Sequence, residues 1–168
     1  MLAALVLAAL TAAAPTPSTG LATIRFHALP PDFPVPVGKR TEPLWSLHGK
    51  AVLINFWASW CKPCTDELKH FVRARETYRT NLIVVTVSSE PHDVAASYLR
   101  LWNIDLPLIE DLNSAISDAY SVPPIPVTVL VAPDGTVSYV SVGELSWPEL
   151  RDALDAALNG QPQHSAQH

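Results

Sequence analysis

Uninterrupted apolar runs give the strongest strand predictions along this chain. "AVLINFW" at 51–57 and "LIVVTVS" at 82–88 are apolar at most positions. Runs of this length without polar alternation are typical of central strands that are covered on both faces. A third run, "VTVLVA", follows Pro126, and "PDG" at 133–135 separates it from "TVSYVSVG". This turn signal predicts that the last two strands pair as an antiparallel hairpin.

Helical periodicity occupies the segments between these runs. Residues 61–78 carry apolar side chains at helical spacing, and a second helix is predicted at 91–102. A helical turn is predicted at 114–120 and a closing helix at 146–159, with Ser146 as its N-cap. The buried face of the second helix is predicted from four residues that recur on one side: Val94, Tyr98, Leu101 and Trp102.

The order of these elements predicts an α/β fold, with a mixed central sheet flanked by helices. Near the N-terminus, "TIRFHA" at 23–28 predicts a short strand, and a proline-rich connection follows it. Both cysteines of the chain, Cys61 and Cys64, fall where the first central strand turns into its helix. Open α/β folds usually place their chemistry at that carboxyl edge of the sheet.

The two ends of the chain differ from its middle. Residues 2–14 form an apolar run with the length of a signal-peptide core, shorter than the ~20 residues of a membrane span. We therefore expect a signal peptide or N-terminal membrane anchor at 1–21 and a periplasmic or other extracytoplasmic location, although no basic residue follows Met1. Residues 22–160 are predicted to form one globular domain, and 161–168 a disordered tail.

Composition narrows the function classes. Of the 168 residues, 48% are hydrophobic and only 16% are charged, which suits a globular core. A net charge of −5 without any basic run argues against nucleic acid as a partner. The six histidines are scattered, so the sequence predicts neither a metal site nor a bound cofactor.

The spacing of the cysteines has a physical interpretation. At a helix N-terminus, unpaired N–H groups and the helix dipole stabilise the Cys61 thiolate, and Lys62 adds a neighbouring cation. Cys64, one turn further, lies within disulfide reach and is expected to be more buried. An exposed thiolate beside a buried partner predicts an attacking and a resolving cysteine in thiol–disulfide exchange.

Other roles for the pair fit the sequence less well. Zinc needs four ligands, and Thr65 replaces the histidine that haem attachment requires after the second cysteine. A peroxiredoxin would have Pro and Thr or Ser where Ile54 and Ala58 stand. A structural disulfide across so short a loop would restrict the unfolded chain little. A thiol peroxidase and a non-catalytic metallochaperone remain the alternatives to thiol–disulfide exchange.

Two segments, 49–68 ("GKAVLINFWASWCKPCTDEL") and 106–135, resemble the TlpA/ResA-type thioredoxin-like proteins, which are exported bacterial thiol–disulfide oxidoreductases. The resemblance covers 22–160 and implies a thioredoxin fold with an N-terminal hairpin, for which 23–28 is the candidate, and a central insertion at 91–111. It also implies that the protein reduces protein disulfides, for example in cytochrome c maturation. Its electrons would come from an upstream membrane thiol–disulfide donor.

The resemblance implies roles for four further residues. Pro126 matches a proline that thioredoxin-like folds hold in the cis form beside the disulfide; it leaves the Ile125 backbone free to pair with an extended substrate segment. A plain turn proline is the alternative. Trp60 matches a tryptophan that borders the substrate groove. Glu67 matches a glutamate thought to tune the thiols, and its alternative role is that of an ordinary first-turn acid.

The chain departs from the family pattern at two places. Cytosolic thioredoxins have a buried aspartate on the central strand, where this chain has Asn55. Because an amide cannot accept the proton of the resolving cysteine, that role falls to Glu67 or to water. Pro123 and Pro124 replace the Arg/Lys–Gly common before the cis-proline, so the substrate loop is expected to have a different shape.

Overall fold

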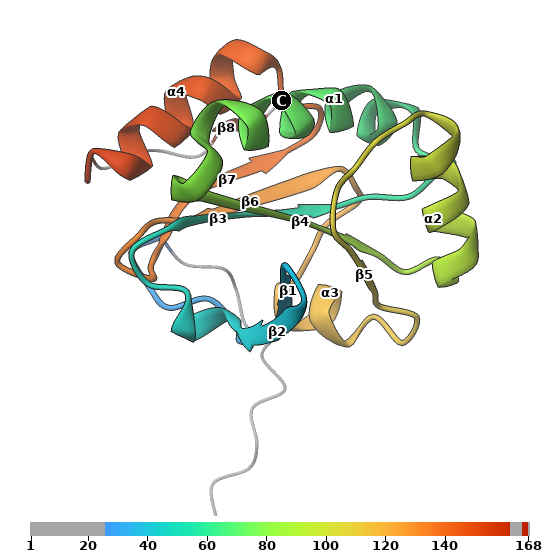
Figure 1. Ribbon diagram of the computed structural model, residues 1–168, viewed down its shortest axis with the longest axis horizontal. Helices are drawn as coiled ribbons and strands as arrows, with labels where there is room; N and C mark the ends of the chain where they lie inside the picture. The colour runs from blue at the N-terminus through green and yellow to red at the C-terminus, as the bar shows by residue number, and fades with distance from the viewer. Residues whose placement is uncertain (1–25, 162–165, 168) are drawn as a thin grey trace, which may run out of the picture.

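The computed structural model has a central sheet with helices on both faces (Figure 1). It describes residues 26–161 and 166–167, so the leader or anchor predicted at 1–21 lies outside the described residues. Within the described ranges, no helix combines the length and the apolar character needed to cross a membrane.

The central sheet is mixed, as the sequence predicts. Its strands are β3 (Ala51–Phe56), β4 (Leu82–Ser88), β5 (Leu108–Glu110), β6 (Val127–Val131), β7 (Val137–Val142) and β8 (Ala166–Gln167). Strand β3 pairs parallel with β4 and antiparallel with β6. The order across the sheet is β5-β4-β3-β6-β7-β8, so the strand that leads into the cysteines lies well inside it.

Helices cover the two faces unequally. The α-helices of the described residues are α1 (Lys62–Tyr78), α2 (His92–Leu101), α3 (Ala115–Ala119) and α4 (Trp147–Leu158). Single 3₁₀ turns occur at Leu44–Ser46 and Arg79–Asn81. Helices α1 and α4 lie on one face of the sheet, and the short α3 lies on the other (Figure 1). Ser146 and Glu149 form a capping box at the start of α4, which confirms the predicted N-cap.

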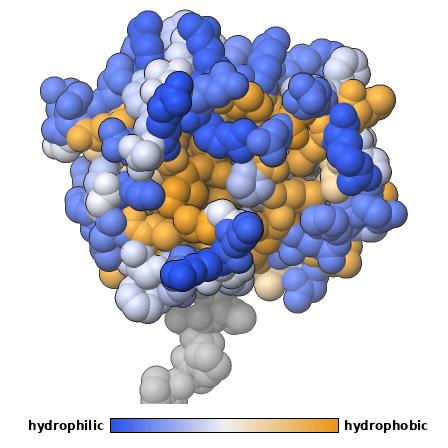
Figure 2. Space-filling model, in the orientation of Figure 1, coloured by the Kyte–Doolittle hydropathy of each residue, from blue (hydrophilic) through white to orange (hydrophobic). Residues whose placement is uncertain are grey.

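The sheet separates two apolar cores. All six residues of β3 are buried, and because side chains alternate along a strand, Leu53 packs into one core and Ile54 into the other. The first core lies under α1 and α4, and the second includes Phe33 and Tyr120 on the opposite face. Viewed from outside, apolar residues gather in the middle of one face, with hydrophilic residues above and below them (Figure 2).

The N-terminal hairpin does not lie where the sequence predicts it. Strands β1 (Pro34–Val37) and β2 (Arg40–Pro43) pair antiparallel in a sheet of their own, within the stretch interpreted as a proline-rich connection. The predicted position at 23–28 is therefore wrong for its described part, where His27 and Ala28 hydrogen-bond instead to Val137. Prolines are tolerated here because a two-stranded hairpin has only edge strands.

Helix α2 buries a different face from the predicted one. Ala95 and Leu99 are its buried residues, whereas Val94, Leu101 and Trp102 are exposed. Of the predicted face, Tyr98 is partly buried and packs against the core. Helical periodicity favours the larger apolar side chains, but the small Ala95 lets the helix lie close to its neighbours. Val94, Leu101 and Trp102 therefore remain on the outside of the molecule.

The C-terminal segment also departs from its prediction. Within the tail predicted as disordered at 161–168, β8 pairs in parallel with β7. Strand β7 would otherwise leave a row of unpaired N–H and C=O groups along the sheet edge, and two residues of the tail pair with part of it.

Candidate active site

The two cysteines form a disulfide at the junction of β3 and α1. Cys61 is the N-cap of α1, and the backbone N–H of Cys64 donates to Cys61 Sγ across 3.4 Å. Pro63 occupies the first turn, where its missing N–H breaks no helical hydrogen bond. Cys61 is 6% exposed and Cys64 is completely buried. The sulfur that sits at the helix terminus is thus also the one with access to solvent.

The segment before β6 lies against the disulfide. Cys61 Sγ is 3.9 Å from the carbonyl oxygen of Ile125, and the peptide bond between Ile125 and Pro126 is cis. Pro126 has no N–H and immediately precedes β6. The backbone beside the sulfurs therefore offers a carbonyl oxygen to an approaching chain.

A buried carboxyl group lies on the same helix. Glu67, three residues after Cys64, is inaccessible to solvent. The Asn55 amide donates to its Oε1 across 2.8 Å, and the backbone N–H of Leu145 donates to its Oε2 across 2.9 Å. The same amide also donates to Thr128 Oγ1 on β6. Glu67 thereby joins α1, the central strand and the segment that precedes α4.

Burial changes the acidity of this carboxyl group. Desolvation raises the pKa of Glu67 to about 8, and the hydrogen bonds from Leu145 and Asn55 only partly oppose this effect. A group with that pKa can take up or release a proton near neutral pH. Asn55 Oδ1 is buried without a hydrogen-bond partner among the residues that the structure describes. A rotation of the amide would present this oxygen to a protonated Glu67.

The neighbouring lysine is paired rather than free. Lys62 Nζ lies 2.6 Å from Asp66 Oδ1, one turn along α1, and the side chain is largely exposed. The sequence predicts that Lys62 stabilises the Cys61 thiolate. Because Asp66 partly neutralises the ammonium group, the stabilisation that Lys62 gives a Cys61 thiolate is reduced.

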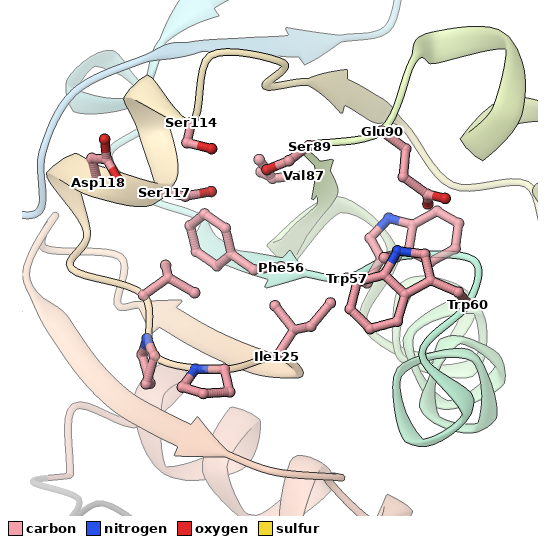
Figure 3. A pocket seen from close by; sticks show the side chains of 14 residues that line it. Phe56, Trp57, Trp60, Val87, Ser89, Glu90, Ser114, Ser117, Asp118 and Ile125 are labelled. Carbon is pink, nitrogen blue, oxygen red and sulfur yellow. The ribbon is translucent and has the colours of Figure 1, made fainter.

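The tryptophans beside the pair have different environments. Trp60 is 75% exposed and lines a cavity of about 450 Å³ together with Ile125 (Figure 3). Trp57 is buried, and its ring packs against Tyr98 at 5.8 Å between centroids. Across the described part of the chain, no three His, Cys, Asp or Glu side chains are grouped closely enough to hold a metal ion.

Comparison with known proteins gives the family. Residues 29–140 match the model described as the AhpC/TSA family. The chain belongs to the AhpC/TSA family. The matched residues include the cysteine pair, the Ile125–Pro126 bond and the strands β3 to β6 around them.

Relatives of this AhpC/TSA protein share a redox activity. It is 29% identical to the thiol-disulfide oxidoreductase ResA of Bacillus subtilis over 126 residues, 74% of this chain and 70% of that protein. It is 30% identical to ResA of Oceanobacillus iheyensis over 125 residues, 73% of this chain and 63% of the relative.

Solved structures support the fold. A thioredoxin-family thiol:disulfide interchange protein from Chlorobium tepidum matches with a TM-score of 0.68 at 26% identity, covering 80% of this chain and 97% of that one. StoA from Bacillus subtilis matches in fold, with a TM-score of 0.63 at 22% identity, covering 75% of this chain and 98% of that one. The AhpC/TSA protein is therefore a thiol–disulfide oxidoreductase of thioredoxin-like fold.

Sequence reasoning missed one residue of this AhpC/TSA site. Glu90, just after β4, accepts hydrogen bonds from the backbone N–H of Ser59 at 2.6 Å and from Ser59 Oγ at 2.7 Å. It thereby fixes the turn between β3 and Cys61. No local pattern could reveal this contact, because 31 positions separate the two residues.

Proposed function

We propose that this oxidoreductase acts outside the cytoplasm as a reductant of protein disulfides, with Cys61 as nucleophile and Cys64 as resolving residue. The observation that carries the residue roles is the placement of Cys61 at the N-terminus of α1, with slight exposure, beside a fully buried Cys64. A helix N-terminus lowers the pKa of a thiol, and the thiolate is the attacking species.

The reaction proceeds by two exchanges. The Cys61 thiolate attacks one sulfur of a substrate disulfide, and the other sulfur leaves as a thiolate with the electrons of the broken bond. Cys64 then loses its proton and attacks Cys61 Sγ, which releases the remaining substrate sulfur. Two electrons have passed to the substrate, and the protein holds the Cys61–Cys64 disulfide. An upstream thiol–disulfide donor at the membrane must then restore the dithiol.

Glu67 is the proposed proton acceptor for the resolving step. Cys64 and Glu67 are three residues apart on α1 and thus on one helix face. With a pKa of about 8, the Glu67 carboxyl group can take up or release a proton near neutral pH, as a proton acceptor for this step must. Asn55 orients the carboxyl group and takes no proton itself.

Trp60, Ile125 and Pro126 form the proposed substrate-docking element. The Ile125 carbonyl oxygen next to Cys61 Sγ can accept a backbone hydrogen bond from an extended substrate segment, and Pro126 contributes no competing donor. The exposed Trp60 ring lines the same cavity as Ile125 and provides apolar contact area there.

Export and cytochrome c maturation complete the proposal. The apolar run at 2–14 supports a leader or anchor, and the resemblance to TlpA/ResA-type proteins supports a reductant in cytochrome c maturation. Fractionation of cells that express the full chain, with mass analysis of its N-terminus, tests export and distinguishes a cleaved leader from an anchor. Recovery of the intact chain in the cytoplasm would contradict the proposed export.

The midpoint potential of the Cys61–Cys64 couple tests the direction of the reaction. We expect a value near or below the roughly −270 mV of thioredoxin, measured by equilibration with a thiol buffer, alkylation and mass analysis. A value near the roughly −120 mV of DsbA would overturn the reductant assignment. Failure to form a reversible disulfide would overturn exchange altogether.

Trapping tests the roles of the two cysteines. Cys64→Ser should accumulate a mixed disulfide with a substrate protein, because the resolving step is blocked, whereas Cys61→Ser should not. The reverse pattern would assign the attack to Cys64. Peroxide consumption in a thiol-coupled assay should be absent, since Ala58 provides no hydroxyl group where a peroxidase has Thr or Ser.

A further inference from the structure

We infer that the cavity beside the disulfide, lined by Trp60 and Ile125, binds the residues that flank the reactive cysteine of a substrate and selects segments carrying Lys or Arg. This inference rests on the proposed function, in which Cys61 attacks the substrate. It adds a specificity in charge that the exchange chemistry alone does not require.

The cavity opens next to the reacting sulfur. Ile125 lines it, and the carbonyl oxygen of this residue is 3.9 Å from Cys61 Sγ. Trp60, which directly precedes Cys61, lines the side formed by the active-site turn (Figure 3). A polypeptide that presents a cysteine to Cys61 therefore places its neighbouring residues over this cavity.

The size and floor of the cavity suit a side chain of a polypeptide. Its volume is about 450 Å³, within the range of roughly 300–1,000 Å³ typical of ligand sites. Phe56 and Val87, near the ends of β3 and β4, line it with little exposed surface of their own, and Ile125 and the prolines at 123–124 add apolar lining. These residues favour an apolar side chain next to the substrate cysteine.

The charged side chains of described residues that line the cavity are all negative. Glu90 and Asp118 are the carboxylates among the lining residues, and no Lys, Arg or His of the described chain lines the cavity. They lie at opposite sides of it, with the Phe56 ring between them (Figure 3). The bonds that Glu90 accepts from Ser59 come from neutral donors and leave its negative charge in place. This arrangement complements a segment with an apolar residue and a cation.

Three short peptides test the charge preference. They share one cysteine, capped as a 2-thiopyridyl disulfide, and an apolar neighbour, and they differ only in an adjacent Lys, Gln or Glu. Each turnover oxidises Cys61 and Cys64 to the disulfide and releases the peptide thiol and neutral 2-thiopyridone, which is followed by absorbance. We expect the reduced wild-type protein to react about fivefold faster with the Lys peptide than with the Glu peptide.

Variants separate the cavity from the overall negative charge of the molecule. Asp118→Asn should lower the Lys-to-Glu rate ratio to about two, and Asp118→Lys should lower it to about one. Glu76→Gln removes the same unit of charge from an exposed site on α1, across the sheet, and should leave the ratio at its wild-type value. In 1 M salt the wild-type ratio should approach one, because the screening length falls to about 3 Å.

Failure of the charge preference and failure of the proposed exchange activity give different results in these assays. Equal rates for the three peptides, or an unchanged ratio in Asp118→Asn and Asp118→Lys, would overturn the inference while exchange itself stands. A ratio that falls equally in Glu76→Gln would also overturn it, since the net charge would then be the cause. If wild-type protein reduces none of the peptides, the proposed function fails and the inference fails with it.

Discussion

Glu67 has an unusual position for a carboxyl group, because no part of it reaches solvent. The sequence places it three residues after Cys64 but leaves open whether it is a first-turn acid at the surface or a partner of the thiols. Its hydrogen bonds from Asn55 and Leu145 show a buried and fully partnered carboxyl group, which excludes the surface role. The sequence alone does not reveal the hydrogen bond between Asn55 and Glu67, which the structure shows.

A pH-dependent stability follows from this burial. The pKa of Glu67 is about 8 in the folded protein, against 4.5 for the exposed group. Between these values the folded state holds a proton that the unfolded chain has lost, so the free energy of unfolding should fall as pH rises from 4.5 to 8. The total loss is on the order of 4 kcal/mol. Glu67→Gln should remove this part of the pH dependence, measured by urea unfolding at several pH values.

The control for this measurement is Glu76→Gln, at an exposed position on the same helix. It should leave the pH profile of the wild type in place. If the difference between wild type and Glu67→Gln is constant from pH 5 to pH 8, the carboxyl group titrates normally, and its proposed part in proton transfer is wrong.

The turn between β3 and α1 depends on a contact from the segment that follows β4. Glu90 holds the Ser59 backbone, and Ser88 Oγ in turn accepts from the Glu90 N–H across 3.2 Å. Cys61 follows two residues after Ser59, so this network determines where the nucleophilic sulfur lies. Glu90 acts through the turn and is a positioning residue.

Replacing Glu90 should therefore loosen the turn. Glu90→Ala removes the acceptor of a half-buried N–H and hydroxyl, which should lower the free energy of unfolding by about 1–2 kcal/mol. The rate at which Cys61 reacts with a small neutral disulfide should fall as well, because the sulfur is held less firmly. Stopped-flow kinetics and urea unfolding measure the two effects.

The conservative variant Glu90→Gln supplies the comparison. Its amide oxygen can still accept one hydrogen bond, so both the stability and the rate should recover in part. Equal behaviour of the Ala and Gln variants in the rate would show that the contact with Ser59 does not position Cys61.

Elements with continuous apolar runs were predictable, and those defined by distant contacts were not. The runs at 51–57 and 82–88 became β3 and β4 because strands covered on both faces need no polar alternation. The hairpin at 34–43 was missed because its prolines argue against a strand unless both strands are edges. The sequence predicts the position of helix α2 but not most of its buried face. Ala95 contributes little to an apolar pattern, yet it is buried, whereas the larger Leu101 is exposed.

For the molecule as a whole, β3 makes the two cores interdependent. Leu53 and Ile54 are adjacent in sequence and fully buried on opposite faces of the sheet. Leu53→Ala and Ile54→Ala should each lower the free energy of unfolding by about 2–5 kcal/mol, because each leaves a cavity in a close-packed core. Both should shift one cooperative transition, followed by tryptophan fluorescence and by far-UV circular dichroism.

The exposed Leu101 provides the matched control. Leu101→Ala removes the same atoms from a side chain that is 78% exposed and should change stability by no more than about 0.5 kcal/mol. If Ile54→Ala instead splits the transition, so that the two probes no longer coincide, the core around Phe33 and Tyr120 unfolds separately from the one beneath α1.

The hydrogen bond from Leu145 to Glu67 joins residues 78 positions apart and makes the charge of the buried carboxyl group observable by spectroscopy. Carboxyl groups have no useful chromophore, and this one is hidden from solvent. The amide resonance of Leu145, however, depends on the charge of the oxygen that accepts its proton. In a backbone NMR spectrum this single cross-peak reports when the buried acid gains or loses its proton, without any label at the cysteines.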